Sequence, residues 1–415
     1  MTDVTSQTRL IGSGQQDGIS AQLRLRDPWL KALTMALSRL AVGRLALTLP
    51  SGQQICFGEK DDDLPEVSVQ LHRARAAKRI LQSGGIGLGE SYIDGDWSCD
   101  NVTGLIELAL RNEAALKSAM VGKWLSGFVN FMRHLRARNS RSGSRRNIAY
   151  HYDLGNSFYR HWLDGTMTYS AALFDHPDQP LEEAQLQKYR RIADLANIGD
   201  GAKILEIGCG WGGFARLAAT DYGATIDGIT LSEEQLGYAK AQARHLRMED
   251  QTRFHFRDYR DQAGSFDAIV SIEMFEAVGE ENWDSYFQTI KRNLKDGGRA
   301  VVQVITIADD RYENYRKSAD FIQRYIFPGG QLPSKTAFID AAARNGLTAH
   351  IAEEFGADYA ATLKIWKEKF LEKWDQIEPL GFDERFKRMW EFYLQYCEAG
   401  FRQQTIDVVI FEIHR

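Results

Sequence analysis

The stretch Lys203-Ile204-Leu205-Glu206-Ile207-Gly208-Cys209-Gly210-Trp211-Gly212-Gly213-Phe214 decides the fold of this chain. Its first five residues form an apolar run typical of a short buried strand, and the glycine cluster after them predicts a tight turn. Phe214, Leu217 and Ala218 then recur at helical spacing. A strand, a glycine-rich turn and a helix in this order predict the nucleotide-binding corner of a doubly wound α/β domain.

Two ligand classes fit this corner, and a purely structural turn is a third interpretation. Gly208, Gly210 and Gly213 satisfy the G-x-G-x-x-G pattern, which alone indicates a dinucleotide only weakly. Glu206 precedes the first glycine at the end of the strand, which suits a cofactor with a cationic amino acid end and no pyrophosphate. S-adenosylmethionine (SAM) is such a cofactor. A dinucleotide site also needs an acid at the tip of the next strand, but the strand expected there continues past Asp227. We therefore predict SAM.

The pattern of strands predicts the domain around this corner. The expected strands are 203–207, 224–230, 252–256, 266–272, 299–305, 348–353 and 405–413, all within a catalytic domain at 147–415. Seven strands that alternate with helices and end in a late closing pair predict the Rossmann-like α/β sheet of class I SAM methyltransferases. An inserted segment at about 309–335 follows the fifth strand, so we expect it over the carboxyl edge of the sheet, where substrates bind.

The sequence before the catalytic domain falls into three parts. Residues 1–20 are polar and are expected to be disordered. Residues 21–115 predict a small N-terminal α+β domain with a hairpin, in which the glycine-rich run 84–92 is interpreted as a structural turn. Residues 116–146 combine basic and aromatic side chains, which predicts an amphipathic helix and a linker that bind an anionic membrane surface. The alternative is that the apolar stripe packs on the catalytic domain and the arginines are solvated.

Composition sets limits on the function. A chain of 415 residues is long enough for two domains, and its formal net charge of −5 argues against a general nucleic-acid binder. No apolar run is long enough to predict a membrane span. The four cysteines are far apart, so neither a metal site nor a disulfide framework is predicted. We expect a cytoplasmic protein that associates peripherally with the inner membrane, and a homodimer is left open.

More specific motifs lie along the catalytic domain. They are 150–159 with 166–170, the glycine turn with 230–232 and Gln235, 273–279, 325–334, and 359–366. In these stretches the chain resembles the cyclopropane fatty acid synthases and mycolic acid cyclopropane synthases. The resemblance implies transfer of a methylene or methyl group from SAM to the cis double bond of an unsaturated phospholipid acyl chain. A cyclopropane is the favoured product, and a methyl-branched or methylene fatty acid is the alternative. A non-catalytic protein that binds SAM and lipid is a weaker one.

The resemblance also implies which residues form the site. It assigns SAM binding to Tyr169, Ser170, Glu206, Gly208, Gly210, Gly212, Thr230, Leu231, Ser232, Gln235, Asp258 and Tyr259. It implies a bound bicarbonate as the catalytic base, held by the side chains of Glu276 and Tyr359 and the backbone of Ile305. Two more catalytic positions depart from the family pattern. Ala171 stands where many members have Cys, and Gln303 stands where many have a His that contacts bicarbonate.

The departure at Gln303 bears on the chemistry. Glutamine donates a hydrogen bond but does not titrate, so proton removal, and not methyl transfer, is the step left open. Alkylation of an alkene leaves a carbocation, which aromatic faces stabilise. The aromatic residues expected to do so are Tyr169, Phe275, Tyr325, Phe327 and Tyr359. The alternatives are that Glu276 only caps a helix and that Tyr359 is a core tyrosine.

Overall fold

The structure is a computed structural model that describes residues 26–60, 64, 66–117 and 154–415. The chain forms two compact units. Unit 1 consists of the described N-terminal residues together with Phe382–Gln403, and unit 2 contains the rest of the described chain. Helix α18 (Glu384–Arg402) therefore groups with the N-terminal unit although it lies near the end of the sequence. The predicted basic segment at 116–146 lies almost wholly outside the described residues.

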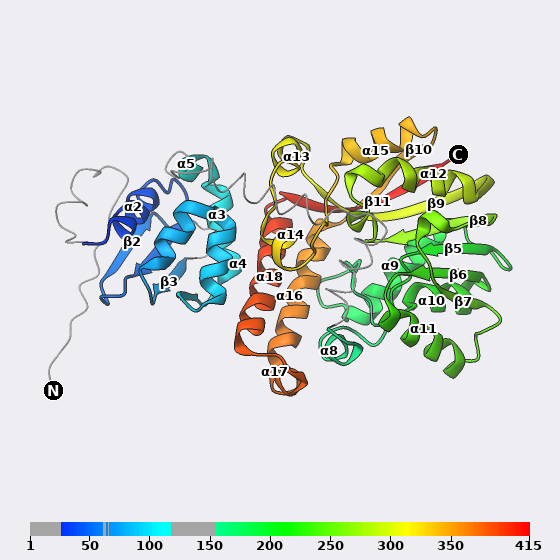
Figure 1. The fold of residues 1–415 in the computed structure, drawn as a ribbon, viewed down its shortest axis with the longest axis horizontal. Coiled ribbons are helices and arrows are strands. Elements are labelled where there is room, and N and C mark those ends of the chain that lie inside the picture. The colour runs from blue at the N-terminus through cyan, green and yellow to red at the C-terminus, as the bar shows by residue number, and fades with distance from the viewer. Residues whose placement is uncertain (1–25, 61–63, 65, 118–153) are drawn as a thin grey trace. The chain divides into compact units, whose positions relative to one another are not determined.

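Unit 1 is a small α+β unit (Figure 1). Its sheet has the order β2-β1-β3-β4. The strands are β1 (Arg44–Thr48), β2 (Gln54–Gly58), β3 (Val67–Leu71) and β4 (Trp97–Cys99). Its other helices are α2 (Pro28–Leu37), α3 (Arg75–Ile93), α4 (Val102–Arg111) and α5 (Glu113–Lys117). The antiparallel pairing of β1 with β2 confirms the predicted hairpin.

The glycine-rich run in unit 1 is part of a helix and not the predicted turn between elements. It lies inside α3, which is interrupted only at Gly84, where φ is 56° and ψ is −130°. A Cβ on Gly87 would lie 2.0 Å from the carbonyl oxygen of Arg79, so the chain beyond the break packs closely against the turn before it. The glycines thus allow a kink with a close backbone approach, which sequence spacing did not distinguish from a loop.

Unit 2 contains a seven-stranded sheet with the order β10-β11-β9-β8-β5-β6-β7. The strands are β5 (Lys203–Ile207), β6 (Thr225–Thr230), β7 (Thr252–Phe256), β8 (Phe266–Ile272), β9 (Leu294–Ile307), β10 (Thr348–Glu354) and β11 (Ile406–His414). Strands β7, β6, β5, β8 and β9 are parallel, and β11 runs antiparallel between β9 and β10. The predicted Rossmann-like sheet with a late closing pair is therefore confirmed.

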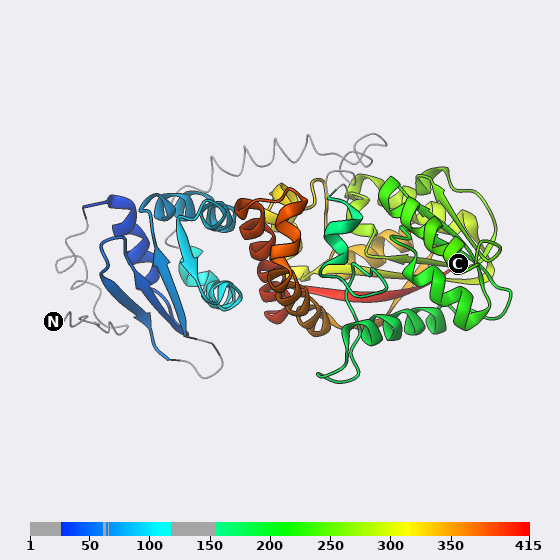
Figure 2. The same ribbon diagram turned by 90° about the horizontal axis from the view of Figure 1, so that it is seen from below.

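Helices cover both faces of this sheet (Figure 2). The longer ones are α9 (Leu181–Leu195), α10 (Gly213–Tyr222), α11 (Glu233–His245), α12 (Trp283–Asn293), α15 (Lys335–Arg344) and α16 (Gly356–Glu372), and α8 (Asn156–Arg160) and α17 (Trp374–Ile377) are short. Phe275 is fully buried in the core under the sheet, where its ring packs against Trp283, Tyr286 and Phe338. The prediction that Phe275 stabilises a cation is therefore wrong, because this ring belongs to the core.

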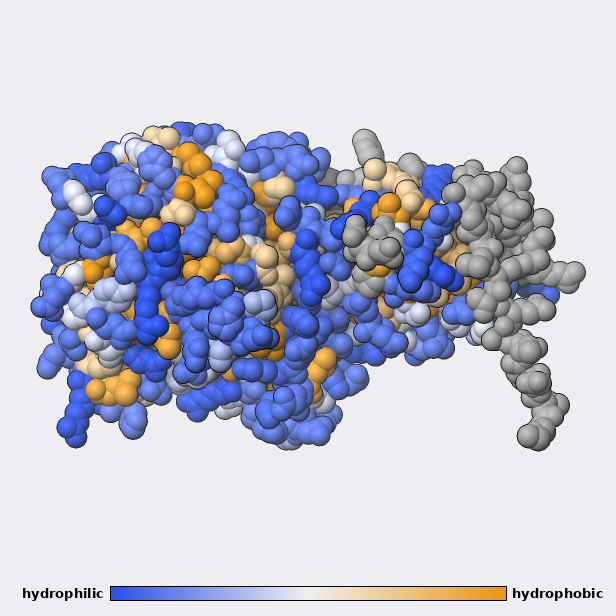
Figure 3. Space-filling model, turned by 180° about the vertical axis from the view of Figure 1, so that it is seen from behind, coloured by the Kyte–Doolittle hydropathy of each residue, from blue (hydrophilic) through white to orange (hydrophobic). Residues whose placement is uncertain are grey.

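The inserted segment holds two short helices, α13 (Asp309–Tyr315) and α14 (Phe321–Tyr325). Two backbone hydrogen bonds fix its end to the sheet. The N–H of Ile307 donates to Pro333 O at 2.9 Å, and the N–H of Gln331 donates to Glu276 O at 2.8 Å. The segment thus lies at the carboxyl edge of β8 and β9, as predicted. Among the described helices, none is long and apolar enough to cross a membrane, and the face in Figure 3 is mainly hydrophilic with small separate apolar areas.

Candidate active site

The glycine turn after β5 needs glycine for its backbone shape. Gly208 and Gly212 have φ values of 82° and 87°, in the left-handed region that other residues avoid. A Cβ on Gly208 would also lie 2.6 Å from Cγ of Met274. The N–H groups of Gly208 and Cys209 donate to Ile229 O, which fixes the turn to β6. The turn therefore keeps a narrow space open at the carboxyl ends of β5, β6 and β8.

A cavity opens to solvent at this edge and contains about 920 Å³ of empty space. Most of the residues predicted to bind SAM line it. They are Tyr169, Ser170, Glu206, Gly208, Gly210, Thr230, Leu231, Gln235 and Tyr259. Sequence reasoning missed other lining residues, namely Met167, Thr168, Tyr189, Trp211, Arg257, Ile272, Glu273 and Met274. Three of the predicted residues, Gly212, Ser232 and Asp258, do not line this cavity.

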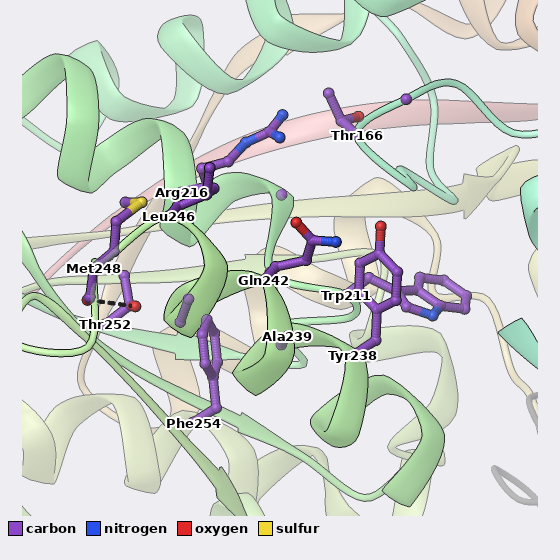
Figure 4. A pocket seen from close by; sticks show the side chains of 14 residues that line it. Thr166, Trp211, Arg216, Tyr238, Ala239, Gln242, Leu246, Met248, Thr252 and Phe254 are labelled. Atoms are coloured by element: carbon purple, nitrogen blue, oxygen red, sulfur yellow. Dashed lines mark hydrogen bonds between the residues drawn. The ribbon is translucent and has the colours of Figure 1, made fainter.

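Each of these three residues has a structural role. Ser232 caps α11, because its Oγ accepts the N–H of Gln235 at 3.2 Å. Both oxygens of Asp258 bind the guanidinium of Arg260, at 2.8 and 2.6 Å. Gly212 faces a second hollow of about 520 Å³ between α10, α11 and β7, which Trp211, Tyr238 and Phe254 also line (Figure 4). Gly212 is thus needed for the turn and for close packing against Phe254.

Within the described chain, Glu206 has the burial and the unbonded oxygen expected of an acid that binds a positively charged group. Its side chain is only 3% exposed, and among the described residues no hydrogen-bond partner reaches its Oε2. Burial raises the pKa of Glu206 to about 8, although the charge of Lys188 lowers it in part. A buried acid with one free oxygen, at the end of a strand and beside a glycine turn, fits the ammonium of an amino acid end. The described residues therefore fit SAM.

Lys188 is a buried cation beside this cavity. It lies on α9 and is fully buried, and its Nζ donates to Oγ of Ser170 at 2.6 Å. The neighbouring Gln185 donates to the backbone oxygen of Ser170 at 2.8 Å. Burial lowers the pKa of Lys188 to about 7, while Glu273, Asp164 and Glu206 raise it in part. Lys188 therefore holds the loop that carries Ser170 and compensates the buried acids.

Glu273 forms the centre of a second group at the same cavity. It follows β8 directly, and its Oε1 accepts the N–H of Ala171 at 2.8 Å and Nε2 of Gln303 at 2.7 Å. Its Oε2 accepts the hydroxyl of Tyr359 at 2.7 Å. Strand β9 supplies Gln303, and helix α16 supplies Tyr359. Three of the five predicted catalytic residues thus meet on one carboxylate that the prediction did not include.

The other two predicted catalytic residues meet at Glu276. Its Oε1 accepts the N–H of Ile305 at 2.5 Å, and among the described residues its Oε2 has no hydrogen-bond partner. Burial, and then the charge of Glu273, raise the pKa of Glu276 to about 8. The interpretation of Glu276 as a helix cap does not hold, because its carboxylate binds a neighbouring strand. The hydroxyl of Tyr359, however, donates to Glu273 and not to Glu276.

Glu273 therefore takes the hydroxyl of Tyr359, which the resemblance assigned to bicarbonate, and donors at the two positions that depart from the family pattern, while the N–H of Ile305 is bound by Glu276. The N–H of Ala171, the amide of Gln303 and the hydroxyl of Tyr359 all bind its two oxygens. The described residues do not fit bicarbonate in the arrangement that the resemblance implied. A signal for Glu273 existed in the sequence, because an acid that follows a central strand lies at the ligand-binding edge of such a sheet.

Comparisons with known proteins identify the family of this chain. The family model described as Mycolic acid cyclopropane synthetase matches residues 139–411. The chain belongs to this family. It is 39% identical over 386 residues to the tuberculostearic acid methyltransferase UfaA1 of Mycobacterium tuberculosis, covering 91% of this chain and 90% of that protein. It is 38% identical to the cyclopropane-fatty-acyl-phospholipid synthase of Escherichia coli K12, covering 80% of this chain and 83% of the relative.

A solved structure extends the comparison to the fold. The mycolic acid cyclopropane synthase CmaA1, complexed with SAH and CTAB, is 30% identical and has a TM-score of 0.61. The match covers 65% of this chain and 98% of CmaA1. As a cyclopropane synthase family member, the protein is a SAM-dependent methyltransferase that modifies lipid acyl chains.

Tyr169 lines this family member's cavity and packs against three other aromatic rings. The ring of Tyr169 lies 5.5 Å from that of Tyr159, 5.4 Å from Trp162 and 5.3 Å from Trp366. Of the aromatic residues that were expected to stabilise a cation, only Tyr169 lines the cavity, and Tyr359 reaches it through Glu273. Tyr325 instead packs on Phe321 within α14, at 5.1 Å between ring centroids.

Proposed function

We propose that this enzyme transfers a methyl group from SAM to the cis double bond of an unsaturated phospholipid acyl chain and then removes a proton to form a cyclopropane. One observation carries the proposal. A single cavity contains both Glu206, with a free oxygen beside the glycine turn, and the fully bonded Glu273 group. The first suits the amino acid end of SAM, and we assign the second to acid–base chemistry at the reacting carbons of the acyl chain.

The residues of the cavity divide the chemistry between them. When bound, SAM supplies an electrophilic methyl carbon, to which the alkene adds while sulfur keeps the electrons of the broken bond. Glu206 and the glycine turn orient that methyl group, and the addition leaves an alkyl carbocation on the acyl chain. The face of Tyr169 stabilises positive charge. Because the donors expected for bicarbonate bind Glu273, no step here depends on bicarbonate.

A second product class has its own support. UfaA1, which is 39% identical over 91% of this chain, carries the name tuberculostearic acid methyltransferase. From the same cation, a hydride shift from the methylated carbon and loss of a methyl proton would give a methylene group. A saturated methyl branch needs a two-electron reductant in addition. We keep the methylene or methyl-branched chain as the alternative to the cyclopropane.

The basic segment at 116–146 concerns access to the substrate. Its sequence supports binding to an anionic membrane surface and hence a peripheral, cytoplasmic location, although its structure lies outside the described residues. Replacing Arg133, Arg136 and Arg138 with alanine should weaken sedimentation with anionic vesicles by about 1 kcal/mol for each arginine. Unchanged vesicle binding would favour the alternative that the segment packs on the catalytic domain.

The decisive experiment follows the methyl group. The purified enzyme is incubated with SAM labelled in the methyl carbon and with vesicles that contain phospholipids with cis-unsaturated chains. We expect labelled acyl chains, and mass spectrometry after derivatisation distinguishes a cyclopropane from a methylene or branched product. SAM binding without transfer of label to lipid would contradict the proposal and favour a protein that only binds.

A further inference from the structure

We infer that Glu273 is this enzyme's own built-in base, a carboxylate tethered where the resemblance implies a bound bicarbonate, so that turnover needs no bicarbonate. The inference rests on the proposed function and deepens its proton-removal step. It starts from the disagreement between the expected donors and their observed partner.

The geometry at Glu273 is that of a filled anion site. Bicarbonate and a glutamate side chain present the same planar pair of oxygens. Both oxygens of Glu273 are bound, one by Ala171 and Gln303 and the other by Tyr359, at 2.7 to 2.8 Å. A free anion in the same place would find these donors occupied and a negative charge beside it. The site therefore selects against a second small anion.

The backbone shows that Glu273 is held in this place at a cost. Its φ is 47°, in the left-handed region, which is strained for a residue other than glycine. Its N–H donates to Gln303 O at 2.9 Å, and Gln303 in turn donates to its carboxylate. Gln303 thus binds both the backbone and the side chain of Glu273. Gln303 does not titrate, but it holds Glu273, which does, in place.

The proposed step balances without another reactant. After methyl transfer, one oxygen of Glu273 takes a proton from the transferred methyl group, and the electrons of that C–H bond close the three-membered ring. Glu273 ends as a neutral acid and returns its proton to solvent before the next turnover. Burial raises the pKa of Glu273 above its ordinary range, which strengthens it as a base, while its three donors limit the rise.

The test compares bicarbonate dependence in the wild type and in two variants. Wild-type turnover is measured in buffer stripped of carbon dioxide and again with added bicarbonate, and we expect no difference. Glu273→Gln should lose about 10²–10⁴-fold in turnover, as expected for removal of a general base, and should keep its affinity for SAM. Glu281→Gln, at an exposed acid of the next turn, is the matched control and should behave as wild type.

Glu273→Gly supplies the second arm, because glycine adopts the left-handed backbone without strain. It should be inactive in stripped buffer and regain turnover with added formate or bicarbonate. NMR with ¹³C-labelled bicarbonate gives a readout apart from activity, and we expect binding to the glycine variant but not to the wild type.

Two outcomes would overturn the inference. They are a wild type whose turnover requires added bicarbonate, and bicarbonate that binds the wild type as tightly as Glu273→Gly. The first of them is measured on the wild type alone and does not depend on how well a variant folds. Absence of lipid methylation under every condition would instead contradict the proposed function, and bicarbonate binding would still test the tethered acid.

Discussion

Glu206 and Glu273 line the same cavity at the ends of adjacent parallel strands, Glu206 buried and Glu273 half-buried. They differ in what they bind. An oxygen of Glu206 has no partner among the described residues, whereas the protein itself donates to both oxygens of Glu273. An acid left incomplete is arranged to receive a charged ligand, while an acid that is fully bonded is fixed in place to act. Under the proposed function, the contrast separates a cofactor end of the cavity, at Glu206, from a reaction end, at Glu273.

The largest effect that would test this contrast is expected at Glu206. Glu206→Gln removes the charge that is expected to meet the ammonium of SAM, and a charge-assisted hydrogen bond contributes about 1.5–3 kcal/mol. Titration calorimetry should show SAM affinity reduced by about 10- to 100-fold. The same measurement on Glu273→Gln should show little change. If both variants lost affinity equally, the division into two ends would be wrong.

Lys188 tests whether the two ends share a counter-charge, since it lowers the pKa of both acids. Burial lowers its own pKa to about 7 from 10.5. Between these values Lys188 binds more protons in the unfolded chain than in the folded chain, so its own contribution to the free energy of unfolding rises with pH. Glu206 and Glu276, whose pKa values are raised to about 8, make an opposite contribution between pH 7 and pH 9, so the contribution of Lys188, roughly 2 kcal/mol, is expected as the difference in pH dependence between the wild type and Lys188→Met. Urea unfolding at both pH values measures it, and parallel behaviour of the two proteins would contradict it.

A substitution at Tyr359 is expected to affect the reaction end of the cavity and not the cofactor end. Tyr359→Phe removes a donor to the carboxylate of Glu273, which costs about 1–2 kcal/mol and should lower kcat about tenfold. A donor stabilises the ionised form, so its loss raises the pKa of Glu273 further. The acidic limb of the pH–rate profile should therefore move to higher pH, while SAM affinity stays constant. A profile that drops uniformly without moving would indicate a purely structural role for Tyr359.

The smallest effect is expected at Ser232, which sequence resemblance assigned to the cofactor. Because its hydroxyl caps α11, Ser232→Ala should lower the free energy of unfolding by about 1 kcal/mol. SAM affinity should change little, since Ser232 does not line the cavity. Thermal unfolding and calorimetry measure the two properties separately. A large loss of SAM affinity would instead support the original assignment of Ser232 to SAM binding.

The sheet could be predicted from the sequence because its signals are local. The apolar run before Gly208 and the recurring strand–helix alternation both depend on residues close in sequence. The helix broken at Gly84 could not be predicted, since the kink depends on packing against Arg79. Phe275 and Ser232 show the same limit within the motifs. Both residues lie in motifs that the sequence identified near the site. Which way each side chain points, however, depends on the surrounding fold.

Many members of the candidate site were predictable, but its central acid, Glu273, and the pairings were not. Tyr359, Gln303 and Ala171 do come together, although 188 positions separate the first and last of them in the chain (359 − 171). Their common partner was hidden because a resemblance supplies the roles that a family shares. It says little about a side chain that takes over the place of a bound ion. In the sequence, Gln303 was the residue that departed from the family pattern at this place. Its hydrogen bond to Glu273 gives the structural reason for that departure.

The left-handed backbone at Glu273 also has a consequence for how such enzymes diversify. Glycine is the residue that this conformation favours most, and the codons of glutamate and glycine differ by one nucleotide. A single point mutation would thus exchange a tethered acid for an empty slot without straining the main chain. Within one lineage, dependence on a dissolved ion could be gained or lost in one genetic step while the surrounding fold stays the same.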